Sequence, residues 1–401
     1  MRIGYLVPDF PAQTHAFFWR EAQALRERGA DVTFFSTRRP PDDACPHAFA
    51  DQARAETIYL FPPPITALAA LALRPAGLVR SIAYIMGLRE TPIGARLKLL
   101  ALIPCAMAMV SACRANGIGH VHIHSFANSA HIGALAQILA GLDYSLTLHG
   151  DLPVYGTDHA AKMQRARLVT AVTRPLAAQI RNLTPDREVP VIWMGVDTGI
   201  FAPQDNPAEI SSDRPLEVLS VTRLSRTKGH RYLLEAMAAL GAEGIRFRYR
   251  IAGDGPERDA ILARAAELGL TDSVELLGAI SQDQVRTLLG EADLFALTSF
   301  GQGEAAPVAV MEAMSCGVPV ICSRIGGTAD MIANGEDGFL VAQEDPDDIA
   351  AAIRRLATES GLGTAIRKAA RTTALSRFDY RIQAQRLSQA MQDAGTDHPA
   401  L

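Results

Sequence analysis

The sequence has few cysteines, few aromatic residues and little net charge. Five cysteines stand among its 401 residues, an odd number, and no two of them have Cys-x-x-Cys spacing. Such a set argues against a disulfide framework and against a structural zinc site, and it fits a reducing cytosol. The net charge of -4 leaves no overall basic surface for nucleic acid, so we do not expect a nucleic-acid-binding function.

Long apolar runs are missing as well. The first residues, MRIGYLVPDF, hold an apolar stretch that is too short for a signal peptide and is typical of a β-strand. No uninterrupted apolar run reaches about 18 residues, so we expect no transmembrane helix. Hydrophobic residues nevertheless make up 48% of the chain, and its length predicts two or three domains, each with its own core. We therefore expect a globular, cytoplasmic protein.

Short apolar strands alternate with amphipathic helices in both halves of the chain. Ile3–Val7 and Asp31–Thr37 are predicted strands, and the helix between them ends at Gly29. The alternation resumes at residue 120, and it includes a predicted strand at Val189–Met194. This order is typical of parallel sheets covered by helices. It predicts two doubly wound α/β domains, in which ligands bind at the carboxyl ends of the strands.

A polar, proline-containing stretch at Gln204–Pro215 separates the two halves. We place the domain boundary near residue 200, because a strand at 216–222 restarts the alternation. The last predicted helix, Tyr380–Asp393, is amphipathic, and we expect it to pack back on the first domain. The expected division of the chain is therefore 1–199, 200–378 and 379–401.

The segment 61–116 departs from this pattern. It is helical in character and rich in Leu, Ala, Ile and Met, with expected breaks at Pro75, Pro92 and Pro104. Its charged residues are five arginines and one lysine against Glu90. One interpretation is a basic, apolar pair of helices that lies on an anionic membrane surface. The other is a helical excursion packed on its own domain, with solvated arginines.

The chemistry of the second half centres on Ser299–Ser323. Pro307 stands where a helix can begin, and Gly317 follows the predicted helix end. Glu304 then lies in the loop before this helix, and Glu312 lies inside it. A helix N-terminus attracts phosphate, and flanking carboxylates accept hydrogen bonds from hydroxyl groups. Phosphates with hydroxyls describe a nucleotide sugar, whereas the plainer interpretation is an acidic loop before a core helix.

Two further loops are predicted to open at the same edge of the second sheet. Arg223 and Lys228 straddle one of them, and such a pair of cations can clamp a diphosphate. The other loop, Gly253–Pro256, has glycines that allow a ligand to approach the backbone closely. Each loop alone has a plainer interpretation, as solvated cations or as an ordinary turn. The order and spacing of the three loops together favour a nucleotide-sugar site.

The second half resembles the retaining GT-B glycosyltransferases of family 4. The resemblance runs through VTRLSRTKGH, GDGPER, EAAPVAVME with AMSCGVPVI, the turn at Gly326–Gly327, and NGEDGFLV. MGVDTGIFAP is similar to the Asn-Gly-Val-Asp junction of that family, with Met194 in place of Asn. The resemblance spans essentially the whole chain and is looser in the first half. It implies the GT-B fold, in which two Rossmann-like domains face a central cleft.

The resemblance also implies roles for single residues. The diphosphate of the donor is expected at Arg223 and Lys228, the ribose at Glu312, and the sugar hydroxyls at Glu304. The family usually has Glu-Gly-Phe where this chain has Glu304-Ala305-Ala306, so the sugar pocket differs there. The expected catalytic residues are His149, Arg223, Lys228 and Glu304, and the expected donor-binding residues are Gly253, Asp254, Gly255, Ala305, Ala306, Pro307, Val308 and Glu312.

In this family the first half binds the acceptor. FPAQTHAFFWRE (10–21) resembles the Ser-Glu-Thr-Phe segment of bacterial exopolysaccharide and colanic-acid-type transferases, with His15 in place of Glu. His149 in TLHGD matches a family histidine that lies over the reacting sugar, although a strand-end histidine can also make a structural hydrogen bond. The expected acceptor or cleft residues are Thr14, His15, His124 and Asp151.

Three histidines, His120, His122 and His124, alternate along one predicted strand and therefore share a face. No acidic residue or cysteine with ligand spacing accompanies them, and the resembling family is typically metal-independent. We therefore expect neither a metal nor a cofactor other than the nucleotide-sugar co-substrate.

The favoured hypothesis is a retaining, metal-independent transferase that moves a hexose from a UDP- or GDP-sugar. The expected acceptor is a polysaccharide precursor or a lipid-linked glycan, and the protein is expected in the cytoplasm or peripherally on the inner face of the plasma membrane. One alternative is a non-catalytic nucleotide-sugar-binding partner subunit, which the presence of Arg223, Lys228, Glu304 and Glu312 disfavours. Another is a nucleotide-sugar epimerase of the same fold, a class without this pair of glutamates.

Overall fold

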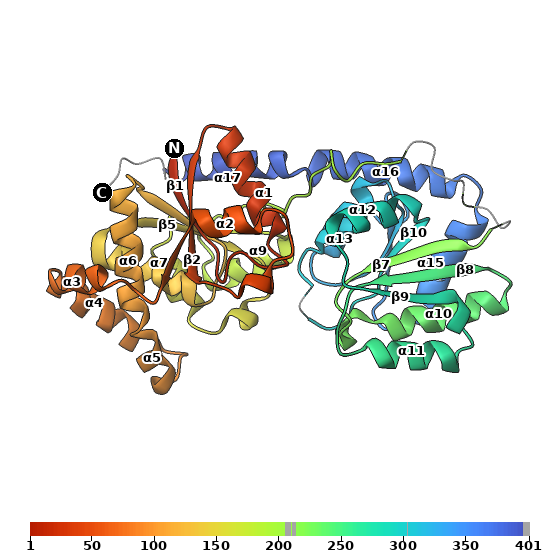
Figure 1. The fold of residues 1–401 in the computed structure, drawn as a ribbon, viewed down its shortest axis with the longest axis horizontal. Helices are drawn as coiled ribbons and strands as arrows, with labels where there is room; N and C mark the ends of the chain where they lie inside the picture. Colours follow the sequence, from red (N-terminus) through yellow and green to blue (C-terminus); the bar gives the residue numbers. More distant parts are fainter. Residues whose placement is uncertain (205–209, 211–213, 303, 396–401) are drawn as a thin grey trace. The chain divides into compact units, whose positions relative to one another are not determined.

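The computed structural model describes residues 1–204, 210, 214–302 and 304–395. Its internal contacts divide the chain into two units (Figure 1). Unit 1 is Met1–Trp193 with Gln383–Leu401, and unit 2 is Met194–Ile382. These divisions lie a few residues from the expected boundaries at 199 and 378. The last helix therefore belongs to both units, since its first residues fall in unit 2 and the rest in unit 1.

Unit 1 is built on a six-stranded sheet in the order β3-β2-β1-β4-β5-β6. All of its strand pairs are parallel, and the strands are dominated by buried apolar side chains, as expected for a sheet covered by helices. Strand β3 and the short helix α2 (Ala50–Glu56) that precedes it were not predicted from the sequence. The strands are β1 (Arg2–Leu6), β2 (Asp31–Arg38), β3 (Thr57–Phe61), β4 (His120–Ile123), β5 (Asp143–Leu148) and β6 (Leu168–Ala171).

The prediction of a strand at Val189–Met194 is wrong. Only an isolated bridge between Ala171 and Val191 forms beside β6. Pro190 explains the difference, because it has no N–H to donate to a ladder. Helices α1 (Ala16–Glu27), α7 (Asn128–Ala140), α8 (His159–Met163), α9 (Arg174–Leu183) and α17 (Tyr380–Asp393) complete this part of the fold.

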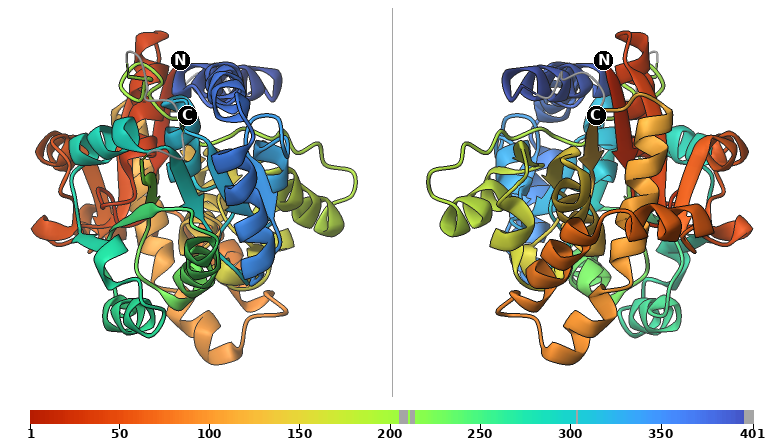
Figure 2. Two further views of the ribbon diagram at one scale, coloured as in Figure 1. Left: turned by 90° about the vertical axis from the view of Figure 1, so that its right-hand side faces the viewer. Right: turned by 90° about the vertical axis from the view of Figure 1, so that its left-hand side faces the viewer.

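The helical segment between β3 and β4 contains α3 (Ile65–Ala72), α4 (Pro75–Met86), α5 (Ile93–Leu99) and α6 (Leu102–Ala115), and Figures 1 and 2 show it in orange. The expected breaks agree with these bounds: α4 begins at Pro75, α5 begins just after Pro92, and a gap of two residues separates α5 from α6, whose first turn contains Pro104.

Ile93–Ala115 forms one helical stretch of 23 residues that is long and apolar enough to cross a membrane by length and composition. Length and composition alone do not contradict the expectation that no helix crosses a membrane, because core helices of globular proteins share both. The apolar residues are interrupted by Arg96 and Lys98, which is why no continuous run was apparent. Its second half, α6, packs against α7, and eight of its residues are buried, as in the core helix of a globular domain.

A single carboxylate ties the turn between α4 and α5 to the rest of unit 1. Asp158, in the left-handed conformation with φ of 55°, accepts hydrogen bonds from the backbone N–H groups of Arg89 (2.8 Å) and Thr91 (2.8 Å). The Thr91 hydroxyl donates to the same carboxylate at 2.6 Å, and Asp158 N–H donates to Glu90 Oε2 at 2.8 Å. The segment is thus fixed to unit 1 by directional contacts as well as by packing.

Unit 2 is built on a second six-stranded parallel sheet, in the order β12-β11-β10-β7-β8-β9. Ser281 and Gln284 form a capping box at the start of α12 (Gln282–Glu291). Helix α16 (Leu362–Arg377) had no prediction. The strands are β7 (Leu216–Val221), β8 (Phe247–Ala252), β9 (Val274–Gly278), β10 (Leu294–Leu297), β11 (Val320–Ser323) and β12 (Phe339–Val341), and the other helices are α10 (His230–Ala242), α11 (Arg258–Glu267), α12 (Gln282–Glu291), α13 (Val308–Ser315), α14 (Thr328–Met331) and α15 (Pro346–Thr358).

Asp293, just before β10, is a buried charged anchor of unit 2 and is only 2% exposed. Its carboxylate accepts two hydrogen bonds from Arg214, at 2.5 and 2.6 Å, and one from the backbone N–H of Glu217 at 2.9 Å. Arg367 of α16 lies 3.4 Å away. The group therefore holds the start of β7, the start of β10 and α16 together.

Replacing Asp293 by Asn should lower the local stability of unit 2 by about 2 kcal/mol, because the arginine charges then lose their compensating carboxylate. Hydrogen exchange of peptides from β7 and β10 measures this change directly. Asp283→Asn is the control, since the Asp283 side chain is 88% exposed and should change the exchange by less than about 0.5 kcal/mol. Equal effects of the two substitutions would contradict the anchor.

Candidate functional site

Three loops follow the neighbouring strands β10, β7 and β8 at the carboxyl edge of the unit 2 sheet. We call residues 222–229, 253–256, 298–302 and 304–307 the edge loops. Leu224 N–H donates to Asp254 O at 2.9 Å, and Phe300 N–H donates to Thr227 O at 2.8 Å. The Thr298 hydroxyl donates to Gly229 O at 3.1 Å. The edge loops therefore form one hydrogen-bonded structure, as the parallel topology predicts.

Two glycines allow these loops to approach at backbone distance. A Cβ on Gly253, whose φ is +142°, would lie 1.8 Å from the carbonyl oxygen of Thr222. A Cβ on Gly326, after β11, would lie 1.7 Å from the carbonyl oxygen of Glu304. Both separations are far below any real contact, so only glycine fits at either position. This packing places the backbone of Glu304 and that of the Arg223 loop.

Lys228 and Glu304 form an ion pair within the edge loops. Their side chains are 16% and 11% exposed, so the pair is largely shielded from water. Burial, and then the nearby charge of Arg223, lower the pKa of Lys228 to about 8. Two residues that are 76 positions apart thus meet at the centre of the predicted site, with the exposed Arg223 on the same loop.

Helix α13 begins one residue later than predicted, because Pro307 is its N-cap rather than its first residue. The first-turn N–H groups of a helix have no partner within the helix, so this end remains suited to an anion. Ala305 is half-buried, Ala306 is buried, and Ala305 O accepts a hydrogen bond from Gly327 N–H at 2.7 Å. Glu312 is half-buried in the second turn of α13.

Asp254 has a local structural contact. Its carboxylate accepts a hydrogen bond from Gly255 N–H at 2.8 Å, which closes the turn of the GDG loop. The side chain is exposed at the rim, so it stabilises the loop while the neighbouring glycines keep the backbone accessible.

Unit 1 brings two predicted histidines together at the carboxyl edge of its own sheet. His149 follows β5 and His124 follows β4, and His149 Nε2 lies 3.0 Å from His124 Nδ1. The rings of Phe17 and Phe18 lie against His149, with centroid distances of 5.6 and 5.2 Å. Burial lowers the pKa of His149 to about 3 and that of His124 well below its usual value. Both imidazoles are therefore neutral at pH 7.

The other predicted acceptor residues have different surroundings. His15 is the N-cap residue of α1, where its side chain caps no N–H, and its ring packs against Phe18 at 5.2 Å. Burial lowers the pKa of His15 to about 4. Thr14 is exposed. Asp151 Oδ1 accepts a hydrogen bond from Gln179 Nε2 at 2.7 Å, so it joins the loop after β5 to α9.

His120 and His122 are held by buried hydroxyl groups. Ser145 Oγ lies 2.7 Å from His120 Nε2 and 2.7 Å from His122 Nδ1. Thr147 Oγ1 lies 2.9 Å from His122 Nε2. Within the part of the chain that the structure describes, no group of three or more His, Cys, Asp or Glu side chains is arranged to hold a metal ion. These two histidines thus help to hold β4 to β5.

Two residues beside His124 were missed by the sequence reasoning. Glu21 Oε1 lies 3.3 Å from His124 Nε2, and the Tyr5 hydroxyl donates to the same oxygen at 2.6 Å. One signal existed in the sequence. Glu21 lies three and four residues after Phe18 and Phe17, which places an acid on the apolar stripe of an amphipathic helix.

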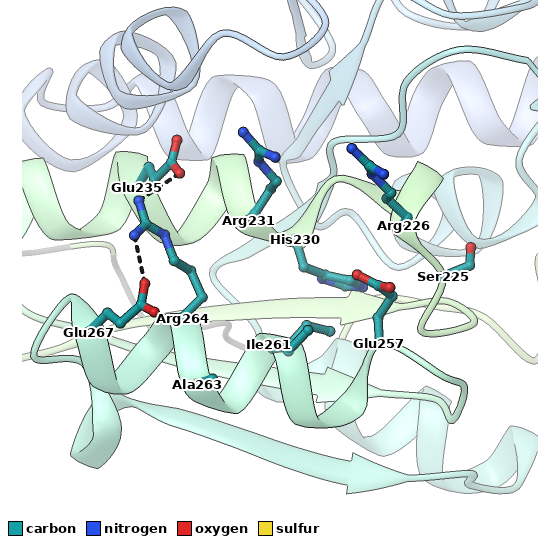
Figure 3. A pocket seen from close by; sticks show the side chains of 11 residues that line it. Ser225, Arg226, His230, Arg231, Glu235, Glu257, Ile261, Ala263, Arg264 and Glu267 are labelled. Carbon is teal, nitrogen blue, oxygen red and sulfur yellow. Dashed lines mark hydrogen bonds and ion pairs between the residues drawn. The ribbon is translucent and has the colours of Figure 1, made fainter.

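A pocket of about 600 Å³ lies between α10 and α11 in unit 2, beside the Arg223 loop (Figure 3). On one side Arg264 donates to Glu235 at 2.8 Å and to Glu267 at 2.9 Å. His230 and Glu257 line the other side. None of the predicted site residues lines this pocket, and much of its charge is paired internally. It therefore borders the edge loops at Ser225 and Arg226 without containing the predicted site residues.

Comparison with known proteins finds one family model and several relatives that match this chain. The family described as "Glycosyl transferases group 1" matches residues 203–373, which include all of them. The chain is 27% identical over 393 residues to the putative colanic acid biosynthesis glycosyltransferase WcaL of Escherichia coli, covering 91% of this chain and 92% of that protein. It is 27% identical over 415 residues to the amylovoran biosynthesis glycosyltransferase AmsK of Erwinia amylovora, covering 98% and 99%.

Among solved structures, HepE of Anabaena in complex with UDP matches with a TM-score of 0.75. The match has 19% sequence identity and covers 98% of this chain and 100% of HepE. At 19% identity, this similarity is evidence for the fold alone. Two parallel six-stranded sheets with covering helices, matched over their full length, show that this chain has the GT-B fold.

Because Arg223, Lys228 and the α13 N-terminus present positive potential together, inorganic pyrophosphate should stabilise unit 2. At about ten times its dissociation constant it should add about 1.4 kcal/mol, read as a rise in unfolding temperature or as slower exchange of the edge-loop peptides. Lys228→Met should weaken the effect at least about 10-fold in pyrophosphate concentration. Lys368→Met, at an exposed position of α16, should leave it unchanged. Equal responses of the two variants would rule out the anion site.

Proposed function

Residues 203–373 form a group 1 glycosyl transferase domain in a chain of GT-B fold, and we propose that the protein transfers a hexose from a UDP- or GDP-sugar with retention of configuration. The observation that carries the proposal is the meeting of Arg223, Lys228 and Glu304 in the edge loops. This combination offers cations for a diphosphate and a carboxylate for hydroxyl groups within one packed structure. The protein is a glycosyltransferase, and its donor and mechanism are what we propose.

In the proposed mechanism, the donor diphosphate takes the place of Glu304 as the partner of Lys228. Arg223, Lys228 and the α13 N-terminus stabilise the negative charge that grows on the leaving nucleoside diphosphate. Glu304, released from Lys228, accepts hydrogen bonds from sugar hydroxyls, and Glu312 accepts hydrogen bonds from the ribose. The edge loops contain no second carboxylate in a nucleophile's role, so we assign same-face attack with the departing phosphate as base. His149 is assigned to hydroxyl groups of the reacting sugars.

The acceptor is proposed from the relatives and from the surface of unit 1. WcaL and AmsK are named for colanic acid and amylovoran biosynthesis, which supports a growing exopolysaccharide precursor as acceptor. Large apolar side chains are exposed along α3, α4 and α5, and Ile65 and Leu73 are more than four-fifths exposed. A lipid-linked acceptor on an anionic membrane surface accounts for these exposed side chains.

The basic residues near these apolar side chains fall into two groups. Arg74 donates to Leu139 O at 2.9 Å, and Arg96 donates to Thr91 O and Met86 O, so both hold the segment together. Arg89 and Lys98 are exposed, and no side-chain partner is recorded for either within the described residues. Ile93 and Leu97, between them in sequence, are 64% and 57% exposed. Arg89 and Lys98 are therefore the cations proposed to contact lipid headgroups.

Arg223→Ala and Lys228→Ala should each lower turnover at least about 100-fold, equivalent to about 2.7 kcal/mol of transition-state stabilisation. Release of nucleoside diphosphate from a panel of UDP- and GDP-sugars, with a lipid extract as acceptor, measures the effect. Arg226→Ala is the matched control, because Arg226 is an exposed cation of the same loop and should retain near-normal turnover. Normal rates in both Arg223 and Lys228 variants would exclude the diphosphate clamp, and no turnover with any donor would favour a binding subunit.

For the membrane surface, the double substitution of Arg89 and Lys98 by Ser should weaken binding to anionic vesicles about 10-fold or more, since each cation contributes about 1 kcal/mol near such a surface. Co-sedimentation with phosphatidylserine vesicles at increasing salt measures this. A double substitution of Arg28 and Arg181, two exposed arginines of other helices in unit 1, is the charge-matched control. Absence of binding at low salt, or equal weakening in the control, would discard the membrane contact.

A further inference from the structure

A line of polar groups runs through unit 1 from Tyr5 to His149. The Tyr5 hydroxyl donates to Glu21 Oε1 at 2.6 Å, and the same oxygen lies 3.3 Å from His124 Nε2. The second contact is electrostatic, because its geometry at His124 Nε2 is not that of a hydrogen bond. His124 Nδ1 lies 3.0 Å from His149 Nε2. The side chains of His124 and Glu21 are 1% and 15% exposed. The groups come from β1, α1 and the loops after β4 and β5, and we call them the Glu21 relay.

The relay ends at the second ring nitrogen of His149. His149 Nδ1 is buried and has no hydrogen-bond partner among the residues that the structure describes. A buried polar nitrogen without a partner is costly, so it indicates a place where a ligand group is received. A neutral imidazole has one nitrogen that donates and one that accepts. The role of His149 Nδ1 is therefore the opposite of the role of His149 Nε2. If Nε2 donates to His124, Nδ1 is an acceptor, and if Nε2 accepts from His124, Nδ1 is a donor.

When Glu21 is ionised, its carboxylate can only accept. Its negative charge, 3.3 Å from His124 Nε2, favours the His124 tautomer that carries the proton on this nitrogen, which leaves Nδ1 as an acceptor. His149 must donate from Nε2 to that nitrogen, and His149 Nδ1 becomes a free acceptor. It can then take a hydrogen bond from a hydroxyl group.

When Glu21 is protonated, the polarity of every link reverses. A neutral acid whose proton is directed at His124 Nε2 favours the other His124 tautomer. His124 then donates from Nδ1 to His149 Nε2, and His149 carries its proton on Nδ1. The open nitrogen then donates. One proton on a buried acid thus changes an acceptor into a donor at the other end of the relay, without any change in net charge on the histidines.

The surroundings of these residues make Glu21, rather than a histidine, the group that gains or loses a proton near neutral pH. Burial raises the pKa of Glu21 to about 7, and the hydrogen bond from Tyr5 acts in the opposite direction. His122 packs against His124 at 4.5 Å, and His15 lies near His124 and His149 from the start of α1. Burial lowers the pKa of each of these four histidines, so they remain neutral while Glu21 titrates.

We propose that Glu21 is a positioning residue which, acting through His124, sets whether His149 Nδ1 accepts or donates a hydrogen bond. The consequence for activity rests on the proposed function, in which His149 contacts hydroxyl groups of the reacting sugars. Above the Glu21 transition, His149 Nδ1 is an acceptor for a sugar hydroxyl. Below it, Nδ1 is a donor. The transfer reaction therefore responds to the protonation of a residue that touches no substrate.

Nitrogen NMR of protein carrying 15N-labelled histidine tests the relay without any substrate. In the wild-type protein, the His149 signals should change from the Nδ1–H form to the Nε2–H form as the pH rises from about 5.5 to about 8.5. In Glu21→Gln the side chain cannot ionise, so His149 should keep one tautomer at every pH. Tyr5→Phe should move the transition to higher pH, because it removes the hydrogen bond that favours ionised Glu21. Glu27→Gln, an exposed acid of the same helix, should retain the wild-type transition.

The matching kinetic readout is the pH profile of kcat/KM. A step near pH 7 should be present in the wild type and in Glu27→Gln and should be absent in Glu21→Gln. An unchanging His149 signal in the wild type, or the same transition in Glu21→Gln, would overturn the relay even if the enzyme is active. The NMR transition in a protein that turns over no donor would support the relay and refute the proposed function, so the two failures are distinguishable.

Discussion

The backbone contact between edge loops is the constraint on which the unit 2 site depends. At Gly253 and Gly326 the facing carbonyl oxygens lie where any Cβ would be, so these loops can pack only without side chains there. This close packing fixes the backbone of Glu304 against the loop after β11 and that of Arg223 against the GDG loop. Arg223, Lys228 and Glu304 can then act as a group, although they come from two different strand ends. The strand order places the two strand ends side by side, and the glycines allow the loops to pack at backbone distance.

Much of this arrangement follows from local patterns in the sequence. The strands predicted at Ile3–Val7, Asp31–Thr37 and 216–222 agree with β1, β2 and β7 to within about a residue, because such boundaries reflect burial and turn chemistry that act over a few residues. The same local logic failed at Val189–Met194, where Pro190 removes a ladder donor, and at β3, whose strand was followed directly by prolines and an apolar helical segment. Helix α13 was displaced by one residue because Pro307 is compatible with both the N-cap and the first turn.

The features that the sequence did not predict are contacts between residues that lie far apart in the chain. Lys228 and Glu304 were each predicted to bind ligand, but their contact with each other depends on strand order and loop packing. The Glu21 relay joins β1, α1, β4 and β5, and its parts are spread over more than 140 residues. An acid on an apolar helix stripe signals a buried partner, yet it does not say which residue that partner is. Such contacts require the three-dimensional structure.

The Lys228–Glu304 pair also has a consequence for selectivity among cellular anions. In the resting protein the two charges compensate each other, so the site carries less attraction for phosphate than its cations alone would give. A free nucleotide can replace Glu304 at Lys228, but it leaves the half-buried carboxylate without a partner. A ligand that brings hydroxyl groups together with its phosphates satisfies both residues. Under the proposed function, the pair therefore favours sugar-bearing nucleotides over plain nucleotides.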